Sequence, residues 1–303
     1  MAQIVLGLGT SHSPQLSTPA EKWPLRAELD TRRTNLYAPP DGKALSYEDL
    51  LAQADRAIVK EITPEKMEAR AAANQQGIAK VAEAFASASP DVLLMIGDDQ
   101  DELIHHNNMP AVCVYWGDSV ATMPRDLTNQ PEAARVAAWA HGDAAKRHPV
   151  ESGLARHIIE SLVDQEFDVA HSHYLTEGQG IGHAFTFVYN RIMNGNEVPT
   201  IPIMLNTYFP PNQPTPKRCY DLGRALRVAV ESWNSQARVG IIASGGLSHF
   251  VVDEELDRKV LKALKEKDTQ ALSSLPRERL NAGTSETRNL ALRRSPGELL
   301  AAP

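Results

Sequence analysis

Several short stretches of this sequence combine small residues with a histidine or a carboxylate, the side chains that bind metals and transfer protons. In GTSHSP at 9–14, small residues leave the imidazole of His12 uncovered, and Pro14 ends the preceding strand-like segment. Comparable stretches are GDDQDE at 97–102, GIGHAF at 180–185, ASGGLSHF at 243–250 and AGTSETRN at 282–289, which contains Glu286. Each can present a polar side chain to a cleft.

Histidine and carboxylate side chains that converge from separate loops are typical of non-haem Fe(II) sites, which keep positions open for the reactants. The two cysteines, Cys113 and Cys219, are too few for a structural zinc cluster. The residue types therefore predict a site for a divalent metal. Spacing along the chain does not show that the loops meet, so hydrogen-bonded structural roles remain the alternative.

Other catalytic templates do not fit the sequence. It contains no GxSxG elbow, no GxxxxGK[ST] loop and no HExxH helix. The stretch GLGTSH does not open a helix as a dinucleotide-binding loop would, because Pro14 follows too soon. The Ser-His pairs at 11–12 and 248–249 are adjacent residues, which point to opposite faces of an extended chain. That geometry is poor for a nucleophile and its base.

The composition is that of an ordinary globular protein, with a net charge of −7 over 303 residues. Nucleic acid is not an expected partner, because phosphate binding needs clustered Lys and Arg. No run of about 18 apolar residues predicts a membrane span. The N-terminal stretch lacks the basic region and the long apolar region of a secretory signal. With two cysteines expected to be reduced, these features predict a cytoplasmic protein.

The elements that would carry these loops alternate along the chain. Apolar runs predict strands near 4–8, 91–96, 111–116, 167–171, 200–205 and 239–243. Helical patterns cover about 47–62, 64–86, 131–147, 151–164, 183–193, 217–233, 253–266 and 268–274. This alternation predicts an α/β fold, a single-domain αβα sandwich over 1–303 around a central mixed sheet. Residues 17–45, rich in proline and charge, are expected to form a long surface excursion.

In such folds, chemistry collects where strands end in loops. His12, His183 and His249 lie in glycine- or serine-lined loops of this kind, as do the carboxylates of Asp98 and Asp99. Three further histidines sit on or beside helical segments and are expected to be exposed or structural, namely His141, His148 and His157.

The chain resembles the catalytic subunits of class III extradiol ring-cleaving dioxygenases, the protocatechuate 4,5-dioxygenase β-subunit family. Within that family it is most similar to the 3-O-methylgallate dioxygenase branch. The resemblance spans about residues 3–290 and rests on several motifs in one order. These are IVLGLGTSHSP, PDVLLMIGDDQ, EFDVAHSHYLTEGQGIGHAF, IPIMLNTYFPPNQPTPKRCYDLGRALRVAVESW, ASGGLSHF and AGTSETRN.

The resemblance implies an activity and roles for particular residues. The activity would be Fe(II)-dependent extradiol cleavage, with O2, of a catechol- or gallate-type aromatic acid such as 3-O-methylgallate or protocatechuate. His12 would be the first iron ligand and Glu286 the carboxylate ligand. His249 would be the catalytic acid and base, and His183 would contact the substrate or oxygen.

One ligand position departs from the family pattern. Better-known members place a second iron-binding histidine where this chain has Gln100, after the predicted strand 91–96. Gln100 can ligate through its amide oxygen, although more weakly than an imidazole. If Gln100 does not bind the metal, either a neighbouring residue does so or the metal site is altered. The neighbouring candidates are Asp98, Asp99, His105 and His106.

The C-terminal stretch 291–303 also departs from the pattern, since family members usually continue further and close the site there. The expectation is a shortened or altered tail with a less enclosed substrate. The resemblance also implies association, as a homodimer or with a small capping subunit, for which this chain has no segment of its own. The basic residues considered for a substrate carboxylate are Lys217, Arg218 and Arg288.

Two other functions compete with ring cleavage. A metal-dependent hydrolase on the same fold would use the metal to activate water, and zinc in place of iron would favour it. A non-catalytic relative would keep the fold and bind a ligand or a protein partner. Gln100 and the altered tail support that second alternative, whereas the retained His12, His183, His249 and Glu286 argue against it.

Overall fold

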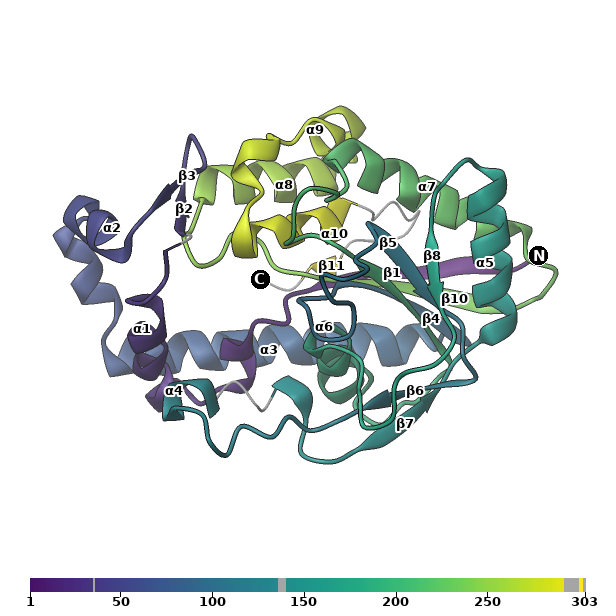
Figure 1. The fold of residues 1–303 in the computed structure, drawn as a ribbon, viewed down its shortest axis with the longest axis horizontal. Helices are drawn as coiled ribbons and strands as arrows, with labels where there is room; N and C mark the ends of the chain where they lie inside the picture. The colour runs from purple at the N-terminus through teal and green to yellow at the C-terminus, as the bar shows by residue number, and fades with distance from the viewer. Residues whose placement is uncertain (35, 136–139, 292–299, 302–303) are drawn as a thin grey trace.

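The computed structural model describes residues 1–34, 36–135, 140–291 and 300–301. Its centre is a seven-stranded sheet with the strand order β11-β1-β10-β4-β9-β5-β8 (Figure 1). The strands are β1 (Gln3–Thr10), β4 (Val92–Asp98), β5 (Val112–Tyr115), β8 (Ala170–Ser172), β9 (Thr200–Leu205), β10 (Arg238–Ser244) and β11 (Leu300–Ala301). Neighbouring strands are parallel except for β5 and β9, which are antiparallel. The predicted α/β fold with a central mixed sheet is confirmed.

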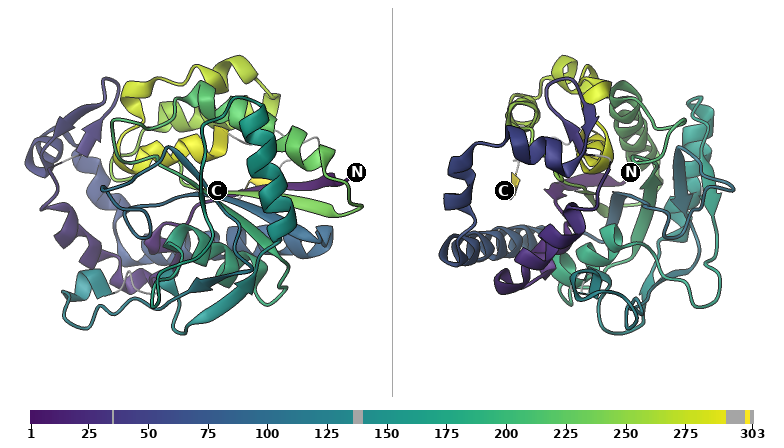
Figure 2. Two further views of the ribbon diagram at one scale, coloured as in Figure 1. Left: turned by 45° about the vertical axis from the view of Figure 1, so that its right-hand side comes forward. Right: turned by 60° about the vertical axis from the view of Figure 1, so that its left-hand side comes forward.

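Helices cover both faces of this sheet (Figures 1 and 2). One face carries α3 (Pro64–Ala88) and α6 (His183–Phe187), which a π-helical segment continues over Val188–Met193. The other face carries α5 (Ser152–Asp164) and α7 (Pro216–Ser232), with α10 (Thr287–Ala291) beside them. The helices α8 (Glu254–Glu266) and α9 (Thr269–Ser273) pack outside α7 in a third apolar cluster.

The central strand β4 shows why an uninterrupted apolar run forms a buried strand. Successive side chains of a strand point to opposite faces. Leu94 and Ile96 accordingly pack in the apolar cluster with α5 and α7, whereas Leu93 and Met95 pack in the cluster with α3 and α6. All four side chains are buried. Covering both faces thus requires apolar residues at successive positions of β4, from Val92 to Ile96.

The predicted helix over 131–147 is confirmed only near its start and is wrong over residues 140–147. Helix α4 covers only Glu132–Arg135, residues 136–139 lie outside the described residues, and β7 (Lys146–Pro149) pairs antiparallel with β6 (Ser119–Thr122). Gly142 has a φ of 77°, which a right-handed helix does not accommodate. Alanine-rich sequence favours a helix locally, but pairing with a distant strand decides the outcome.

The predicted excursion over 17–45 is only partly irregular. It contains α1 (Pro24–Asp30) and a hairpin of β2 (Leu36–Ala38) and β3 (Lys43–Leu45), with α2 (Tyr47–Gln53) directly after it. These elements lie at the left of Figure 1, far from α5. Cys113 and Cys219 are buried free thiols. Among the described helices, none combines the length and hydropathy that a membrane span requires. The predicted tail at 291–303 lies largely outside the described residues.

Candidate metal centre

Three neighbouring parallel strands bring the candidate residues together. The strands β1, β10 and β4 are adjacent and parallel, so their carboxyl ends meet at one edge of the sheet. His12 follows β1 by two residues, Ser244 ends β10, and Asp98 ends β4. Glu286 reaches the same point from a 3₁₀ helix over Ala282–Glu286 that precedes α10. Residues from the two ends of the chain therefore share one site.

His12, Asp98 and Glu286 form a buried cluster of possible metal ligands. Nε2 of His12 lies 3.7 Å from Oδ1 of Asp98 and 3.5 Å from Oε2 of Glu286. The three side chains are almost fully removed from solvent, with exposed fractions of 1%, 0% and 2%. Two carboxylates and an imidazole nitrogen thus face one point from three directions.

The hydrogen bonds of Ser244 identify which nitrogen of His12 carries the proton. The Ser244 hydroxyl donates to the carbonyl of Ala184 at 2.7 Å, so towards His12 it can only accept. It lies 3.1 Å from Nδ1, which must therefore be the N–H of the ring. Nε2 then carries a lone pair, and it has no hydrogen-bond partner among the described residues. Burial is the main effect that lowers the pKa of His12, to about 4, which keeps the ring neutral.

The two carboxylates have opposite pKa shifts. Burial, together with the nearby charge of Glu286, raises the pKa of Asp98. Burial also opposes ionisation of Glu286, but the charge and the ring hydrogen bond of His249, with a hydrogen bond from the Gly246 backbone N–H, outweigh it and lower the pKa of Glu286. Two such close carboxylates resist joint ionisation unless a cation lies between them. With the lone pair on Nε2, this donor set fits a divalent metal ion.

The amide of Gln100 lies next to these carboxylates. Its Nε2 donates to Oδ2 of Asp98 at 2.9 Å and to Oε1 of Glu286 at 3.3 Å. The amide nitrogen therefore faces both carboxylates. The geometry therefore places Gln100 beside the cluster and the carboxylate of Asp98 within it.

The other neighbours that were considered as ligands do not join the cluster. Asp99 accepts hydrogen bonds from the backbone N–H groups of residues 102–104. His105 is exposed and pairs with Asp101, and the exposed ring of His106 packs edge-on against Phe209. These three side chains shape or cover the turn after β4.

His249 lies at the more open side of the cluster, with 28% of its side chain exposed. Its Nδ1 donates to the carbonyl of Leu247 at 2.8 Å, and its Nε2 lies 3.2 Å from Oε1 of Glu286. Burial alone would lower the pKa of His249, but the charge of Glu286 raises it to about 9. Gly246 and Gly283 flank the ring, and both positions leave room for it. A Cβ on Gly246 would lie 2.9 Å from Nδ1 of His249, and a Cβ on Gly283 would overlap the ring edge.

His183 approaches from the opposite side, at the first position of α6. Its ring meets the ring of His12 edge-on, with centroids 4.9 Å apart. Its Nδ1 lies 2.9 Å from Oε2 of Glu102, whose other oxygen is 3.6 Å from Nε2 of His141. Burial opposes protonation of His183, but Glu102 raises its pKa to about 9. His141 is thus close to the site, at the edge of this second group.

Sequence reasoning missed several residues of the site. Tyr208 donates to Oε1 of Glu286 at 2.8 Å, and Asn289 donates to Oδ1 of Asp98 at 3.1 Å. Tyr208 lies three residues after β9, so the rule that sites collect at strand ends could have found it. Asn289 belongs to the AGTSETRN stretch itself. Glu102 lies in the GDDQDE stretch, but nothing in the local sequence predicts its contact with His183.

The basic residues considered for a substrate carboxylate lie elsewhere or are already occupied. Arg288 is buried and donates to the carbonyls of Pro214, Thr207, Leu280 and Ser285. Lys217 pairs with Asp221, and Arg218 lies over the ring of Phe167. Arg288 is therefore a structural cation that ties α10 to the neighbouring loops.

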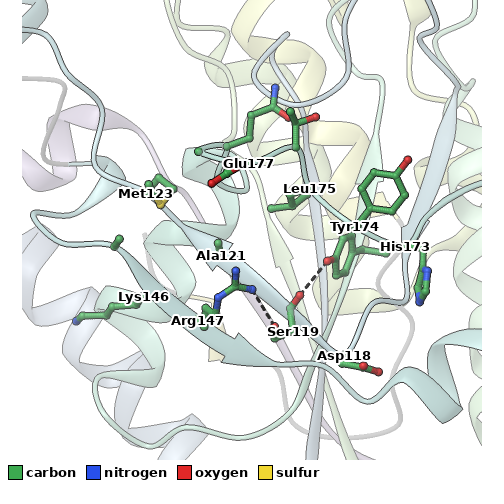
Figure 3. A pocket seen from close by; sticks show the side chains of 15 residues that line it. Asp118, Ser119, Ala121, Met123, Lys146, Arg147, His173, Tyr174, Leu175 and Glu177 are labelled. Carbon is green, nitrogen blue, oxygen red and sulfur yellow. Dashed lines mark hydrogen bonds between the residues drawn. The ribbon is translucent and has the colours of Figure 1, made fainter.

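A cavity of about 710 Å³ lies outside this cluster (Figure 3). Its lining includes Tyr115, Ser119, Arg147 and Tyr174. Tyr115 ends β5, which runs antiparallel to β9, so the cavity starts at the opposite edge of the sheet from His12. None of the residues in the His12 cluster lines it.

Comparison with known proteins gives one family and several partial relatives. Residues 55–292 match the family described as the catalytic LigB subunit of aromatic ring-opening dioxygenase. This match includes every residue of the cluster except His12. A gallate dioxygenase of Pseudomonas putida is 35% identical over 106 residues, which cover 34% of this chain and 30% of the relative.

Two further relatives are both named 2,3-dihydroxyphenylpropionate/2,3-dihydroxicinnamic acid 1,2-dioxygenase. The protein of Comamonas testosteroni is 26% identical over 174 residues, covering 57% of this chain and 48% of the relative. The protein of Cupriavidus necator is 33% identical over 124 residues, which cover 39% of this chain and 37% of the relative. The chain thus matches less than half the length of each of these curated relatives.

Proposed function

Because the chain belongs to the family of catalytic LigB subunits of aromatic ring-opening dioxygenases, we propose that it opens the ring of a catechol- or gallate-type aromatic acid. The proposed reaction is extradiol cleavage with Fe(II) and O2. The observation that carries the proposal is the lone pair on Nε2 of His12, which is buried without a hydrogen-bond partner among the described residues and faces two carboxylates. The expected substrates are acids such as 3-O-methylgallate and protocatechuate.

The proposed ligands are His12, Glu286 and Asp98. The distances favour Asp98 over Gln100, because a carboxylate oxygen of Asp98 faces Nε2 of His12, whereas Gln100 offers its amide N–H groups. When bound, the metal would hold the diol and oxygen together and lower the pKa of a ring hydroxyl. Gln100 and Tyr208 would then orient the carboxylates by hydrogen bonds.

His249 is proposed as the acid and base of the reaction. Its Nδ1–H is held by the Leu247 carbonyl, so Nε2 is the ring atom that would exchange a proton with the substrate. Its partial exposure leaves room for a ligand beside it. His183 is proposed to donate a hydrogen bond from Nε2 on the other side of the site, where it would contact the substrate or oxygen.

Arg33 is proposed to bind the carboxylate of the substrate. Its guanidinium lies 3.9 Å from the centroid of the Phe250 ring, next to His249 in sequence, and it pairs with Asp30. Burial raises the pKa of the Tyr208 hydroxyl, and the charge of Arg33 opposes that rise, so this charge acts at the cluster. A quarter of the Arg33 side chain is exposed, which leaves it available to an anion.

The decisive experiment is anaerobic reconstitution with Fe(II), followed by oxygen uptake on a panel of aromatic diols. The panel contains 3-O-methylgallate, protocatechuate, gallate and 2,3-dihydroxyphenylpropionate, with product absorbance recorded in parallel. Uptake that disappears in His249→Ala and Glu286→Ala, but persists in the surface variant Glu160→Gln, supports the proposal. Bound iron with no uptake on any diol would contradict it and favour a non-catalytic protein. Hydrolysis supported by zinc would favour a hydrolase.

A further inference from the structure

A largely buried carboxylate, that of Glu102, lies behind His183, on the side away from the His12 cluster. One oxygen of Glu102, Oε2, is 2.9 Å from Nδ1 of the His183 ring and 3.1 Å from the backbone nitrogen of the same residue. Only 11% of the Glu102 side chain is exposed. The carboxylate therefore holds the ring and the backbone of His183 together at the start of α6.

The surroundings fix Glu102 in this position. The turn that carries it is tied by Asp99, which accepts hydrogen bonds from the backbone N–H groups of residues 102, 103 and 104. On the other side, a Cβ at Gly182 would overlap Oε2 of Glu102. The GIGHAF stretch thus needs glycine at 182 so that the carboxylate can reach His183.

This contact determines where the other ring nitrogen of His183 points. Nδ1 and Nε2 lie on nearly opposite sides of an imidazole, so a ring held at Nδ1 directs Nε2 away from Glu102. The ring also packs edge-on against His12, with centroids 4.9 Å apart, so it stands at the cluster. Without Glu102, rotation of the ring would leave Nε2 without a defined direction.

We propose that Glu102 is a positioning residue that acts through His183. It holds Nδ1–H so that Nε2 of His183 faces the reactants, and Gly182 provides the space for this contact. The inference rests on the proposed function, because His183 is taken to contact the substrate or oxygen there. Removing a carboxylate that orients a histidine in this way typically lowers activity by about 10- to 100-fold.

The first test separates a role through His183 from a general structural role. Glu102→Ala should lower kcat by about 10- to 100-fold, with KM and metal content nearly unchanged. Glu102→Gln, which keeps the shape of the side chain, should lower kcat by less. The exposed control Glu160→Gln should leave kcat unchanged. In a His183→Ala background, Glu102→Ala should cause little further loss. An equal loss in both backgrounds would overturn the proposal.

The second test does not depend on activity. In the metal-free protein, the Nδ1–H proton of His183 should give a downfield NMR resonance, assigned by its loss in His183→Ala. It should disappear or move upfield in Glu102→Ala and in Gly182→Ala, where the added methyl group displaces the carboxylate. An unchanged resonance in Glu102→Ala would contradict the proposal. If this resonance behaves as expected but the wild-type protein cleaves no diol, the proposed function fails while the contact stands.

Discussion

Nε2 of His12 lies 3.5 Å from Oε2 of Glu286, although the first residue follows the first strand and the second lies near the end of the described chain. Asp98 completes the group at 3.7 Å from the same nitrogen. Because Nδ1 of His12 must donate to Ser244, the lone pair of Nε2 faces both carboxylates.

Asp98 and Gln100 should differ in their effect on metal affinity. Asp98→Asn removes a proposed ligand charge, so the dissociation constant for Fe(II) should rise by more than about 100-fold, whereas Gln100→Ala removes an outer hydrogen-bond donor and should cost about 10-fold. Competition with a chromophoric chelator under anaerobic conditions measures both values. A larger loss in Gln100→Ala than in Asp98→Asn would identify Gln100 as the ligand.

Metal removal should destabilise the protein, because it leaves two buried carboxylates facing each other. A metal at 100 times its dissociation constant adds about 2.7 kcal/mol to the free energy of unfolding. In the metal-free protein, Asp98→Asn should be at least as stable as the wild type, since it removes the burial of an ionisable carboxylate and its repulsion by Glu286, which together raise the pKa of Asp98. Thermal melts with and without chelator test both statements. A metal-free Asp98→Asn that melts well below the wild type would refute the second.

Gly283→Ala should impair His249 without removing the metal. A Cβ at 283 would overlap the His249 ring, and Gly246 closes the other side, so the ring must leave its position. The loss in kcat should approach that of His249→Ala, about 10²- to 10⁴-fold for an acid-base residue. Gly153→Ala on α5 is the matched control, because its Cβ would meet only the Glu151 carboxylate at 3.2 Å. Full activity in Gly283→Ala would contradict the proposed role of His249.

Arg33→Ala should discriminate between acidic and neutral diols. Loss of a charged hydrogen bond costs about 1.5–3 kcal/mol, so KM for protocatechuate should rise by at least about 10-fold. KM for catechol, which has no carboxylate, should change much less. Steady-state oxygen uptake on the two substrates gives the comparison. Equal increases in both KM values would show that Arg33 supports the site but does not bind the acid.

His148 should make the protein sensitive to acid. It is buried against Tyr189, with ring centroids 3.7 Å apart, and burial lowers its pKa below the ordinary 6.5. The unfolded chain therefore takes up this proton more readily, so stability is full above pH 6.5 and is lost as the pH falls below it. Urea unfolding of the wild type and His148→Gln between pH 5 and 8 should show a shallower acid loss in the variant. Parallel pH curves for the two proteins would exclude this role.

Much of this architecture follows from local sequence. The apolar run at 91–96 predicts the buried strand β4, and the glycine- and serine-rich stretches predict the loops that carry His12 and His249. The stretch with Glu286 forms a short 3₁₀ helix instead of a loop. Alternation of strands and helices predicts the mixed α/β sandwich. These inferences succeed because hydrophobic periodicity and turn-forming residues act within a few positions of one another.

Only the tertiary structure decided which polar atoms face one another. Asp98 rather than Gln100 faces His12 because β1, β10 and β4 are neighbours in a particular register, and no local pattern encodes that order. The contact of Glu102 with His183 and the β6–β7 pairing also join segments that are distant in sequence. Local chemistry selects which residues can act, whereas strand order and register, set by packing of the whole core, select their partners.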